Sequence, residues 1–389
     1  MTSTYPNADV RSQIERLGQG PIFQAPRGDG GLVHVVGARP NFVKLSPVHA
    51  ALKGMRQQIV HTGQHYDRRM SDAFFEALDI PKPDVNLAIR GGSHAEQTAH
   101  TMIALEQRFL AERPSALIVY GDVNSTLAAT LVAAKLGIAC IHVEAGLRSG
   151  DRNMPEEINR LVTDRLSDVL LTPSRDADRN LLDEGAAPES IFFVGNVMID
   201  TLSRLLPRIE AHDLPVEDLP EQFVLVTLHR PSNVDASDQL QRILDALEQI
   251  AADIPIVFPV HPRTRARIEG LDRGPLSDKM RLIEPQDYLS FVGLQKRALA
   301  VITDSGGIQE ETTWLGKPCL TLRTTTERPV TITEGTNRLL GEDPDGLRGA
   351  LEEALSDEAK PSRVPEFWDG QAALRIRAIL DALGLCEPA

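Results

Sequence analysis

The sequence has few cysteines, and their arrangement excludes a disulfide framework. The 389 residues include three cysteines, an odd number, and the spacing of Cys140, Cys319 and Cys386 is not that of metal ligands. Cys140 and Cys319 each lie in an apolar stretch that is typical of a strand. We therefore expect both to be reduced and buried, as in a protein of the reducing cytosol.

Long apolar runs and an excess of positive charge are also missing. No stretch approaches the roughly 20 apolar residues needed to cross a bilayer, and residues 1–30 lack the apolar segment of a signal peptide. The formal net charge is −14, whereas nucleic acids and membrane surfaces attract basic proteins. We expect a cytoplasmic protein that binds neither nucleic acid nor membrane, with residues 1–30 forming a flexible extension.

Common motifs of cofactor and metal chemistry are absent too. There is no G-x-x-x-x-G-K-[ST] loop for ATP or GTP hydrolysis, and no G-x-G-x-x-G follows the first predicted strand to bind NAD. His61 and His65 have helical spacing, but no acidic residue lies between them as in zinc peptidases, and Gly63 weakens a helix there. We expect no metal site and no cofactor.

The sequence does contain a regular alternation of short apolar runs with longer segments of helical period. This alternation predicts parallel sheets with crossover helices, and the length suits two domains. The fold class is therefore α/β, with two doubly wound halves. The predicted strands are 32–37, 58–62, 116–120, 139–143, 169–172 and 191–194 in the first half, and 223–227, 256–260, 281–283, 300–303 and 318–322 in the second.

The domain boundaries follow from composition. Residues 202–222 contain three prolines and many acids, which indicates the interdomain linker. We predict domains at 31–202 and 203–369, followed by a helix within 370–389 that could belong to either. Two helices are also predicted, one that follows residues 38–41 and runs through Pro47 to Met55, and one from Ser125 to Leu136.

Polar residues follow the predicted strands where a doubly wound sheet binds its ligands. Arg39, Asp122 and Glu144 follow strands of the first half. In the second half, His229, His261 and the turn beginning at Asp304 do the same, and the glycines of that turn are Gly306 and Gly307. We expect a ligand crevice at these strand ends, although strand ends are commonly polar.

Two turns are suited to phosphate. Asp304-Ser305-Gly306-Gly307 opens a helix, so backbone N–H groups and the helix dipole can face an anion. Gly37 to Pro40 makes a similar turn, with Arg39 and Lys44 available to a diphosphate. The alternatives are an ordinary tight turn in the first case and solvated surface charges in the second.

Three carboxylates, Asp122, Glu144 and Glu156, are the candidates for acid–base work, and Glu144 at the end of an apolar strand should be buried. The alternatives are a helix cap for Asp122 and a solvated helix surface for Glu156 and Glu157. His229 could contact phosphate or transfer a proton, or it could be structural.

Together these stretches resemble the non-hydrolysing UDP-N-acetylglucosamine 2-epimerase family, from about Leu32 to Leu385. The segments that carry the resemblance are GARPNFVKLSPV (37–48), TGQHYD (62–67), GDVNST (121–126), HVEAGLRSGD (142–151), MPEEINR (154–160), GNVMID (195–200), TLHRPSNVD (227–235), PVHPRT (259–264), IEPQDYLSF (283–291), TDSGGIQEE (303–311), GKPCL (316–320) and TERP (326–329).

The resemblance implies a glycosyltransferase-B-like fold of two Rossmann-like domains with a cleft between them, the last helix packing back on the first domain. It implies a homodimer that needs no cofactor and converts UDP-N-acetylglucosamine to UDP-N-acetylmannosamine through UDP and 2-acetamidoglucal. The implied catalytic residues are Asp122, Glu144, Glu156 and His229. The implied substrate-binding residues are Arg39, Lys44, Gln286, Phe291, Ser305, Gly306, Gly307, Glu311 and Arg328, with Arg328 closing on the nucleotide.

Some positions depart from the family pattern. Asn41, Pro231 and Val330 stand where many members carry Glu, Arg and an acid. Residues 90–94 differ from a segment that lines an allosteric pocket in some members, although Gln64 and His65 keep part of it. The alternatives are a hydrolysing relative that releases N-acetylmannosamine and UDP, an epimerase for another UDP-2-acetamido sugar, a glycosyltransferase of the same fold, and a non-catalytic sugar-nucleotide-binding regulator.

Overall fold

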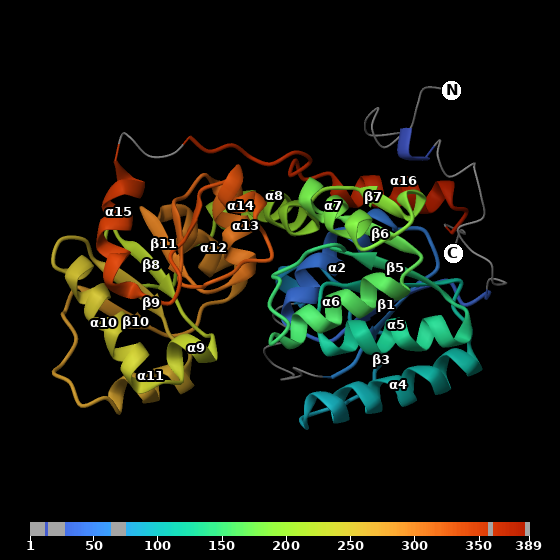
Figure 1. The fold of residues 1–389 in the computed structure, drawn as a ribbon, viewed down its shortest axis with the longest axis horizontal. Coiled ribbons are helices and arrows are strands. Elements are labelled where there is room, and N and C mark those ends of the chain that lie inside the picture. The colour runs from blue at the N-terminus through green and yellow to red at the C-terminus, as the bar shows by residue number, and fades with distance from the viewer. Residues whose placement is uncertain (1–11, 15–27, 64–74, 357–360, 386–389) are drawn as a thin grey trace. The chain divides into compact units, whose positions relative to one another are not determined.

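The computed structural model describes residues 12–14, 28–63, 75–356 and 361–385. The chain divides into two compact units (Figure 1). Unit 1 contains residues 1–204 and 366–389, and unit 2 contains residues 205–365. Each unit is built around one parallel sheet, so the predicted α/β class is confirmed.

Unit 1 has a seven-stranded sheet in the order β3-β2-β1-β4-β5-β6-β7, with every pair parallel. Its central strands are largely apolar and buried because helices cover both faces, as for β1, whose five residues, His34 among them, are all buried. The strands are β1 (Leu32–Val36), β2 (Gln57–His61), β3 (Val85–Asn86), β4 (Ala116–Tyr120), β5 (Ala139–Val143), β6 (Val169–Thr172) and β7 (Ile191–Phe193). The helices of this part of the chain are α2 (Arg39–Ala51), α4 (His94–Ala111), α5 (Asn124–Leu136), α6 (Pro155–Leu166), α7 (Arg175–Asp183), α8 (Val197–Glu210) and α16 (Ala372–Ala382).

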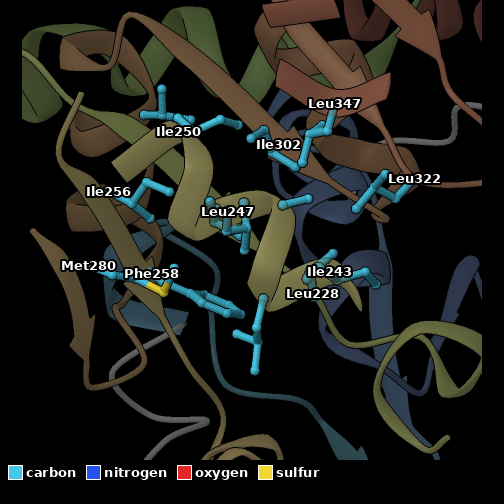
Figure 2. Close-up of a cluster of buried hydrophobic side chains, with 14 of the residues drawn as sticks. Leu228, Ile243, Leu247, Ile250, Ile256, Phe258, Met280, Ile302, Leu322 and Leu347 are labelled. Carbon is cyan, nitrogen blue, oxygen red and sulfur yellow. The ribbon is translucent and has the colours of Figure 1, made fainter. Parts of the chain in front are cut away.

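Unit 2 has a six-stranded parallel sheet in the order β10-β9-β8-β11-β12-β13. The strands are β8 (Val224–Thr227), β9 (Ile256–Pro259), β10 (Met280–Ile283), β11 (Ala300–Thr303), β12 (Cys319–Thr321) and β13 (Asn337–Leu339). The helices are α9 (Pro231–Val234), α10 (Ser237–Ala251), α11 (Pro262–Glu269), α12 (Tyr288–Arg297), α13 (Gly306–Leu315), α14 (Val330–Thr333) and α15 (Leu347–Leu355). Figure 2 shows one of its core clusters, which contains Ile243 and Leu247 of α10 and Phe258 and Ile302 of the sheet.

The strand predictions are confirmed, but two other expectations are wrong. The expected linker over 202–222 is helical up to Glu210, because Leu202, Leu205 and Ile209 form a buried stripe that outweighs Pro207 within the helix. Helix α2 begins at Arg39, within the residues 38–41 that were expected to precede it, since Pro40 fits a first helical turn, and it ends at Ala51 and not at Met55. The short strands β3 and β13 were not predicted.

The last helix belongs to unit 1. Arg377 of α16 donates to the carbonyl oxygen of Ala51 in α2 (2.8 Å), and the buried Asp200 carboxylate accepts the amides of Ala372 (3.0 Å) and Ala373 (2.7 Å). Trp368 is also buried here, so the division falls before Glu366 and not at residue 370.

Other expectations concern the chain's ends and its cysteines. Within the predicted extension, Gln13 is buried and donates to the Phe193 carbonyl oxygen (3.5 Å). Cys140 and Cys319 are free and buried, as predicted, while Cys386 lies outside the described residues. None of the helices in the described part of the chain combines the length and the apolar character needed to cross a bilayer.

The strand order fixes where ligands can bind. In each sheet the strand order reverses beside the strand that comes first along the chain. The reversal lies between β1 and β4 in unit 1 and between β8 and β11 in unit 2. A crevice opens at the carboxyl ends of the strands at such a reversal. The loops after β1, β4 and β5, and those after β8 and β11, are therefore the expected ligand-binding loops.

Candidate active site

A buried ion pair joins two of the predicted residues of unit 1. Lys44 of α2 lies with its Nζ 2.6 Å from Oε1 of Glu144, which directly follows β5, and both side chains are at least 96% buried. Gly121, after β4, leaves them room, since a Cβ there would lie 2.7 Å from the Lys44 Nζ. The alternative of a solvated Lys44 is therefore wrong.

The backbone of Glu144 has an unusual conformation. Its φ is +74°, a region that non-glycine residues rarely adopt and that costs about 1–3 kcal/mol. The N–H groups of Glu144 and Ala145 both donate to the Leu171 carbonyl oxygen of the neighbouring strand β6, each at 3.0 Å. The sheet therefore holds a strained residue at a strand end, which is typical of functional positions.

Asp122 follows β4 and is held by a buried arginine. Arg160 of α6 lies with its Nη1 2.8 Å from Oδ2 of Asp122, and its Nε donates to Glu157 (3.1 Å). Asn159 donates to the Asp122 carbonyl oxygen (2.8 Å). Asp122 therefore has an ion-pair partner and lies one strand away from Glu144, since β4 and β5 are neighbours.

The two adjacent glutamates of α6 have different surroundings. Glu156 is exposed, whereas Glu157 is buried and accepts hydrogen bonds from Ser149 N (2.9 Å) and Gly150 N (2.9 Å). The expectation of a solvated surface is therefore wrong for Glu157, because Glu157 anchors the loop that leads from β5 into α6.

Asn41, which stands where many family members carry Glu, holds the turn after β1 through side-chain hydrogen bonds. Its Oδ1 accepts the amides of Gly37 (3.2 Å) and Ala38 (3.1 Å), and its Nδ2 donates to the Tyr120 carbonyl oxygen at the end of β4 (2.8 Å). Arg39 opens α2 in this turn. The predicted residues Gln64 and His65 lie outside the described residues.

In unit 2, His229 is paired with a buried carboxylate. Its Nδ1 lies 2.7 Å from Oδ1 of Asp304, and Asp304 also accepts the backbone amide of Arg230 (2.9 Å). Burial would raise the pKa of Asp304, but His229 and the Arg230 amide outweigh it and hold that pKa below its ordinary value. The loops after β8 and β11 are thereby joined, with the exposed His229 imidazole oriented by Asp304.

The glycine turn after β11 packs against a network of buried charges. Arg328 lies between Glu310 (2.9 Å from its Nε) and Glu327, and Glu327 also pairs with Arg323 (2.7 Å). A Cβ on Gly306 would lie 2.5 Å from Oε1 of Glu327. Arg328 is thus 94% buried and engaged with two carboxylates, which supports the turn. The expected closing of Arg328 on a nucleotide stays a prediction.

The remaining predicted residues of unit 2 lie close by in sequence or in space. Ser305 and Gly307 flank Gly306 at the start of α13. The Gln286 side chain donates to the carbonyl oxygen of Glu284, two residues earlier in the same loop (2.7 Å). Phe291 packs on the edge of a buried apolar cluster. Glu311 of α13 is buried and accepts from Gln295 of α12 (2.6 Å).

Glu311 is expected to make stability depend on pH. Burial raises its pKa from 4.5 to about 7, against the hydrogen bonds from Gln295 and Tyr288. The folded state therefore holds this proton more tightly than the unfolded state. The stabilisation is complete below about pH 4.5 and is lost as pH rises through 7, by up to about 3 kcal/mol.

Urea unfolding of the wild type and Glu311→Gln between pH 4.5 and 8 measures this effect. The free energy of unfolding of Glu311→Gln, minus that of the wild type, should change with pH. The same difference for the control variant Glu269→Gln should stay constant, because Glu269 is an exposed glutamate of α11. Parallel curves for Glu311→Gln and the wild type would contradict the assigned pKa.

The residues that the sequence reasoning missed are buried partners. Arg160 and Glu157 hold predicted residues of unit 1, and their spacing, three residues apart on one helix face, was an available signal. Asp304 was predicted as part of the glycine turn but not as the partner of His229. No group of three or more His, Cys, Asp or Glu side chains suited to a metal ion occurs within the described ranges.

Comparison with known proteins gives the family. The chain matches the family described as UDP-N-acetylglucosamine 2-epimerase over residues 49–381. It is 41% identical over 358 residues to the UDP-N-acetylglucosamine 2-epimerase of Methanocaldococcus jannaschii, covering 89% of this chain and 97% of that protein. It is also 41% identical over 363 residues to the UDP-2,3-diacetamido-2,3-dideoxy-D-glucuronate 2-epimerase of Pseudomonas aeruginosa, covering 90% and 99%.

A solved structure agrees in fold. The crystal structure of the M. jannaschii enzyme in complex with UDP-GlcNAc and UDP superposes with a TM-score of 0.82 at 41% identity, covering 90% of this chain and 99% of that one. The predicted glycosyltransferase-B-like class is confirmed by this match and by the two parallel sheets. The chain belongs to the UDP-N-acetylglucosamine 2-epimerase family.

Proposed function

We propose that this protein inverts carbon 2 of UDP-N-acetylglucosamine, giving UDP-N-acetylmannosamine without a cofactor. A carboxylate removes the C2 proton while the bond from C1 to the UDP oxygen breaks, which leaves 2-acetamidoglucal and UDP. The UDP oxygen then re-adds to C1, and a proton is delivered to the opposite face of C2. The re-addition forms again the two bonds that the elimination breaks, so the reaction needs no oxidant.

The observation that carries this proposal is the pair of carboxylates after neighbouring strands. Asp122 follows β4 and Glu144 follows β5, and each faces a buried cation, Arg160 or Lys44. A weakly acidic C–H needs a carboxylate base in a site that excludes water, and inversion needs a proton donor for each face. Glu156 is the third candidate, and its exposure suits an exchange of protons with solvent.

We assign binding of the uridine diphosphate to unit 2. The departing diphosphate develops negative charge, which N–H groups at a helix start can stabilise. Ser305, Gly306 and Gly307 open α13 and are suited to that role, and His229 is oriented by Asp304 for a phosphate contact or proton transfer. Glu311, beside Gln295, is our candidate for the ribose.

Turnover in deuterated water tests this function. We expect NMR to show UDP-N-acetylglucosamine and UDP-N-acetylmannosamine, both deuterated at C2, at a stable ratio. Free N-acetylmannosamine with accumulating UDP would instead indicate a hydrolysing enzyme. Transfer to an added acceptor without exchange at C2 would indicate a glycosyltransferase, and binding without any exchange would indicate a regulator.

A second substrate is favoured by one specific similarity. The relative from P. aeruginosa acts, by its name, on UDP-2,3-diacetamido-2,3-dideoxy-D-glucuronate, and it is 41% identical to this chain, the same value as for the M. jannaschii enzyme. The solvent-exchange experiment should therefore be run with both sugars. A kcat/KM that is higher for the diacetamido uronate would move the assignment to that substrate and leave the reaction type unchanged.

A further inference from the structure

A buried histidine with no role in the proposed mechanism lies beneath both carboxylate loops of unit 1. His142 of β5 is completely buried, two residues before Glu144. Its Nδ1 lies 2.6 Å from Oδ1 of Asp164 in α6, and its Nε2 lies 2.9 Å from the Gly121 carbonyl oxygen. Both nitrogens of the ring therefore face an oxygen at hydrogen-bond distance.

The two partners restrict the protonation of this ring. A carbonyl oxygen only accepts, so the Nε2 of His142 must carry a proton. Asp164 also accepts from the guanidinium of Arg148 (2.7 Å) and from the Gly146 amide (3.0 Å). A carboxylate with these donors is ionised and cannot give a proton to Nδ1, so Nδ1 must be the donor as well.

The pKa of the carboxylate is in keeping with this arrangement. Burial would raise the pKa of Asp164, but the contacts with His142 and Arg148 outweigh burial and hold it below the ordinary value.

The pair touches the loops on both sides. Through Gly121, His142 fixes the residue that precedes Asp122, and through Gly146, Asp164 fixes the turn that follows Glu144. One buried ion pair therefore holds the backbone of the two loops that carry the proposed acid–base residues. Without the ring's second proton, one of these two attachments would be lost.

We infer that His142 is a positioning residue in its doubly protonated form, which with Asp164 holds the Asp122 and Glu144 loops in register for proton transfer at C2. The positioning role rests on the proposed function, but the charge state does not.

The charged groups around this pair are balanced. Asp164 faces the ring from α6, and Arg148 reaches the same carboxylate from the loop after β5. Arg148 also pairs with Glu184 (2.6 Å). The Lys44 ammonium also lies near Gly121, 2.7 Å from where a Cβ on that residue would be, and is itself paired with Glu144. The positive ring is thus offset by Asp164, and the network contains equal numbers of the two charges.

Nitrogen NMR of the full chain tests the charge state. With histidine labelled by ¹⁵N, the ring assigned through its loss in His142→Gln should show two protonated nitrogens at neutral pH. His34 is the internal comparison: it is also fully buried, and burial together with the charge of His49 lowers its pKa to about 3, so its ring should carry one proton. A His142 ring with a single proton at neutral pH would overturn the inference.

Kinetics test the positioning role. His142→Gln supplies one donor group without charge, and we expect kcat to fall roughly a hundredfold, as for a misplaced reacting group, with KM unchanged. The control His34→Gln removes another buried histidine of the same sheet, one that contacts Tyr120 and Gln57 and neither loop, and should keep kcat. A folded His142→Gln with wild-type kcat would refute the role.

A second variant covers the case in which His142→Gln fails to fold. Asp164→Asn keeps an acceptor for the Gly146 amide but removes the charge, so the His142 ring should lose one proton and kcat should fall. An unchanged ring spectrum and kcat in Asp164→Asn would also overturn the inference. If the wild type does not exchange the C2 hydrogen at all, the proposed function is wrong, while the NMR result still decides the charge state.

Discussion

Replacing Glu144 by glutamine is expected to lower kcat about a thousandfold or more, while UDP still binds with the wild-type affinity. General acid–base groups contribute roughly 10²–10⁴-fold, and Glu144 is buried at a strained strand end, directly after β5. Single-turnover kinetics and calorimetric titration with UDP measure the two quantities separately. A kcat within about tenfold of wild type would remove Glu144 from the catalytic residues.

Stability distinguishes this loss from unfolding. Glu144→Gln leaves the Lys44 ammonium buried without its anion, which should cost about 3–5 kcal/mol. The double variant Lys44→Met with Glu144→Gln removes both charges and should recover most of that free energy of unfolding without recovering kcat. Recovery of kcat in the double variant would show that the single variant was inactive through instability.

Replacing Gly306 by alanine is expected to give the second large effect, on nucleotide binding. The new Cβ would lie 2.5 Å from Oε1 of Glu327 and 2.6 Å from Nη1 of Arg328. Those atoms are the ends of side chains, but both are held in buried ion pairs, so they cannot move without disturbing Arg323 or Glu310. Overpacking of this kind costs about 1–3 kcal/mol.

The shifted turn would also misplace the N–H groups at the start of α13. Hydrogen bonds to charged groups are worth about 1.5–3 kcal/mol, so losing one should weaken UDP binding by roughly tenfold to a hundredfold. The matched control is Gly349→Ala in α15 of the same unit, where a new Cβ meets no atom within 4 Å. Unchanged UDP affinity in Gly306→Ala would mean that this turn does not hold the phosphates.

The sheets and the loops after their strands were predictable because parallel strands covered on both faces appear as continuous apolar runs. Asp122, Glu144 and His229 each follow such a run directly, so their positions needed no tertiary information. The strands β3 (Val-Asn) and β13 (Asn-Arg-Leu) were missed because polar residues interrupt them, so neither forms an apolar run as the equally short β7 (Ile-Phe-Phe) does.

The partners of the site residues were harder to predict because they depend on contacts distant in sequence. Glu156 and Glu157 are the same residue type side by side, and only the loop at Ser149 and Gly150 decides which one turns inward. Similarly, composition indicated a linker at 202–222, whereas residues up to Glu210 belong to α8, whose apolar face is buried. The prolines therefore predicted a linker where the chain is helical as far as Glu210.

The division of the chain affects how it folds as it is made. Residues 205–365 form unit 2 in one uninterrupted stretch, whereas unit 1 also needs residues from Glu366 onward, which are synthesised after unit 2. Until Trp368 and α16 emerge, α2 and Asp200 lack the partners that cover them in the finished protein. Nascent chains should therefore complete unit 2 first. A chain cut short before Glu366 would leave unit 1 with exposed apolar surface that favours aggregation and binding by chaperones.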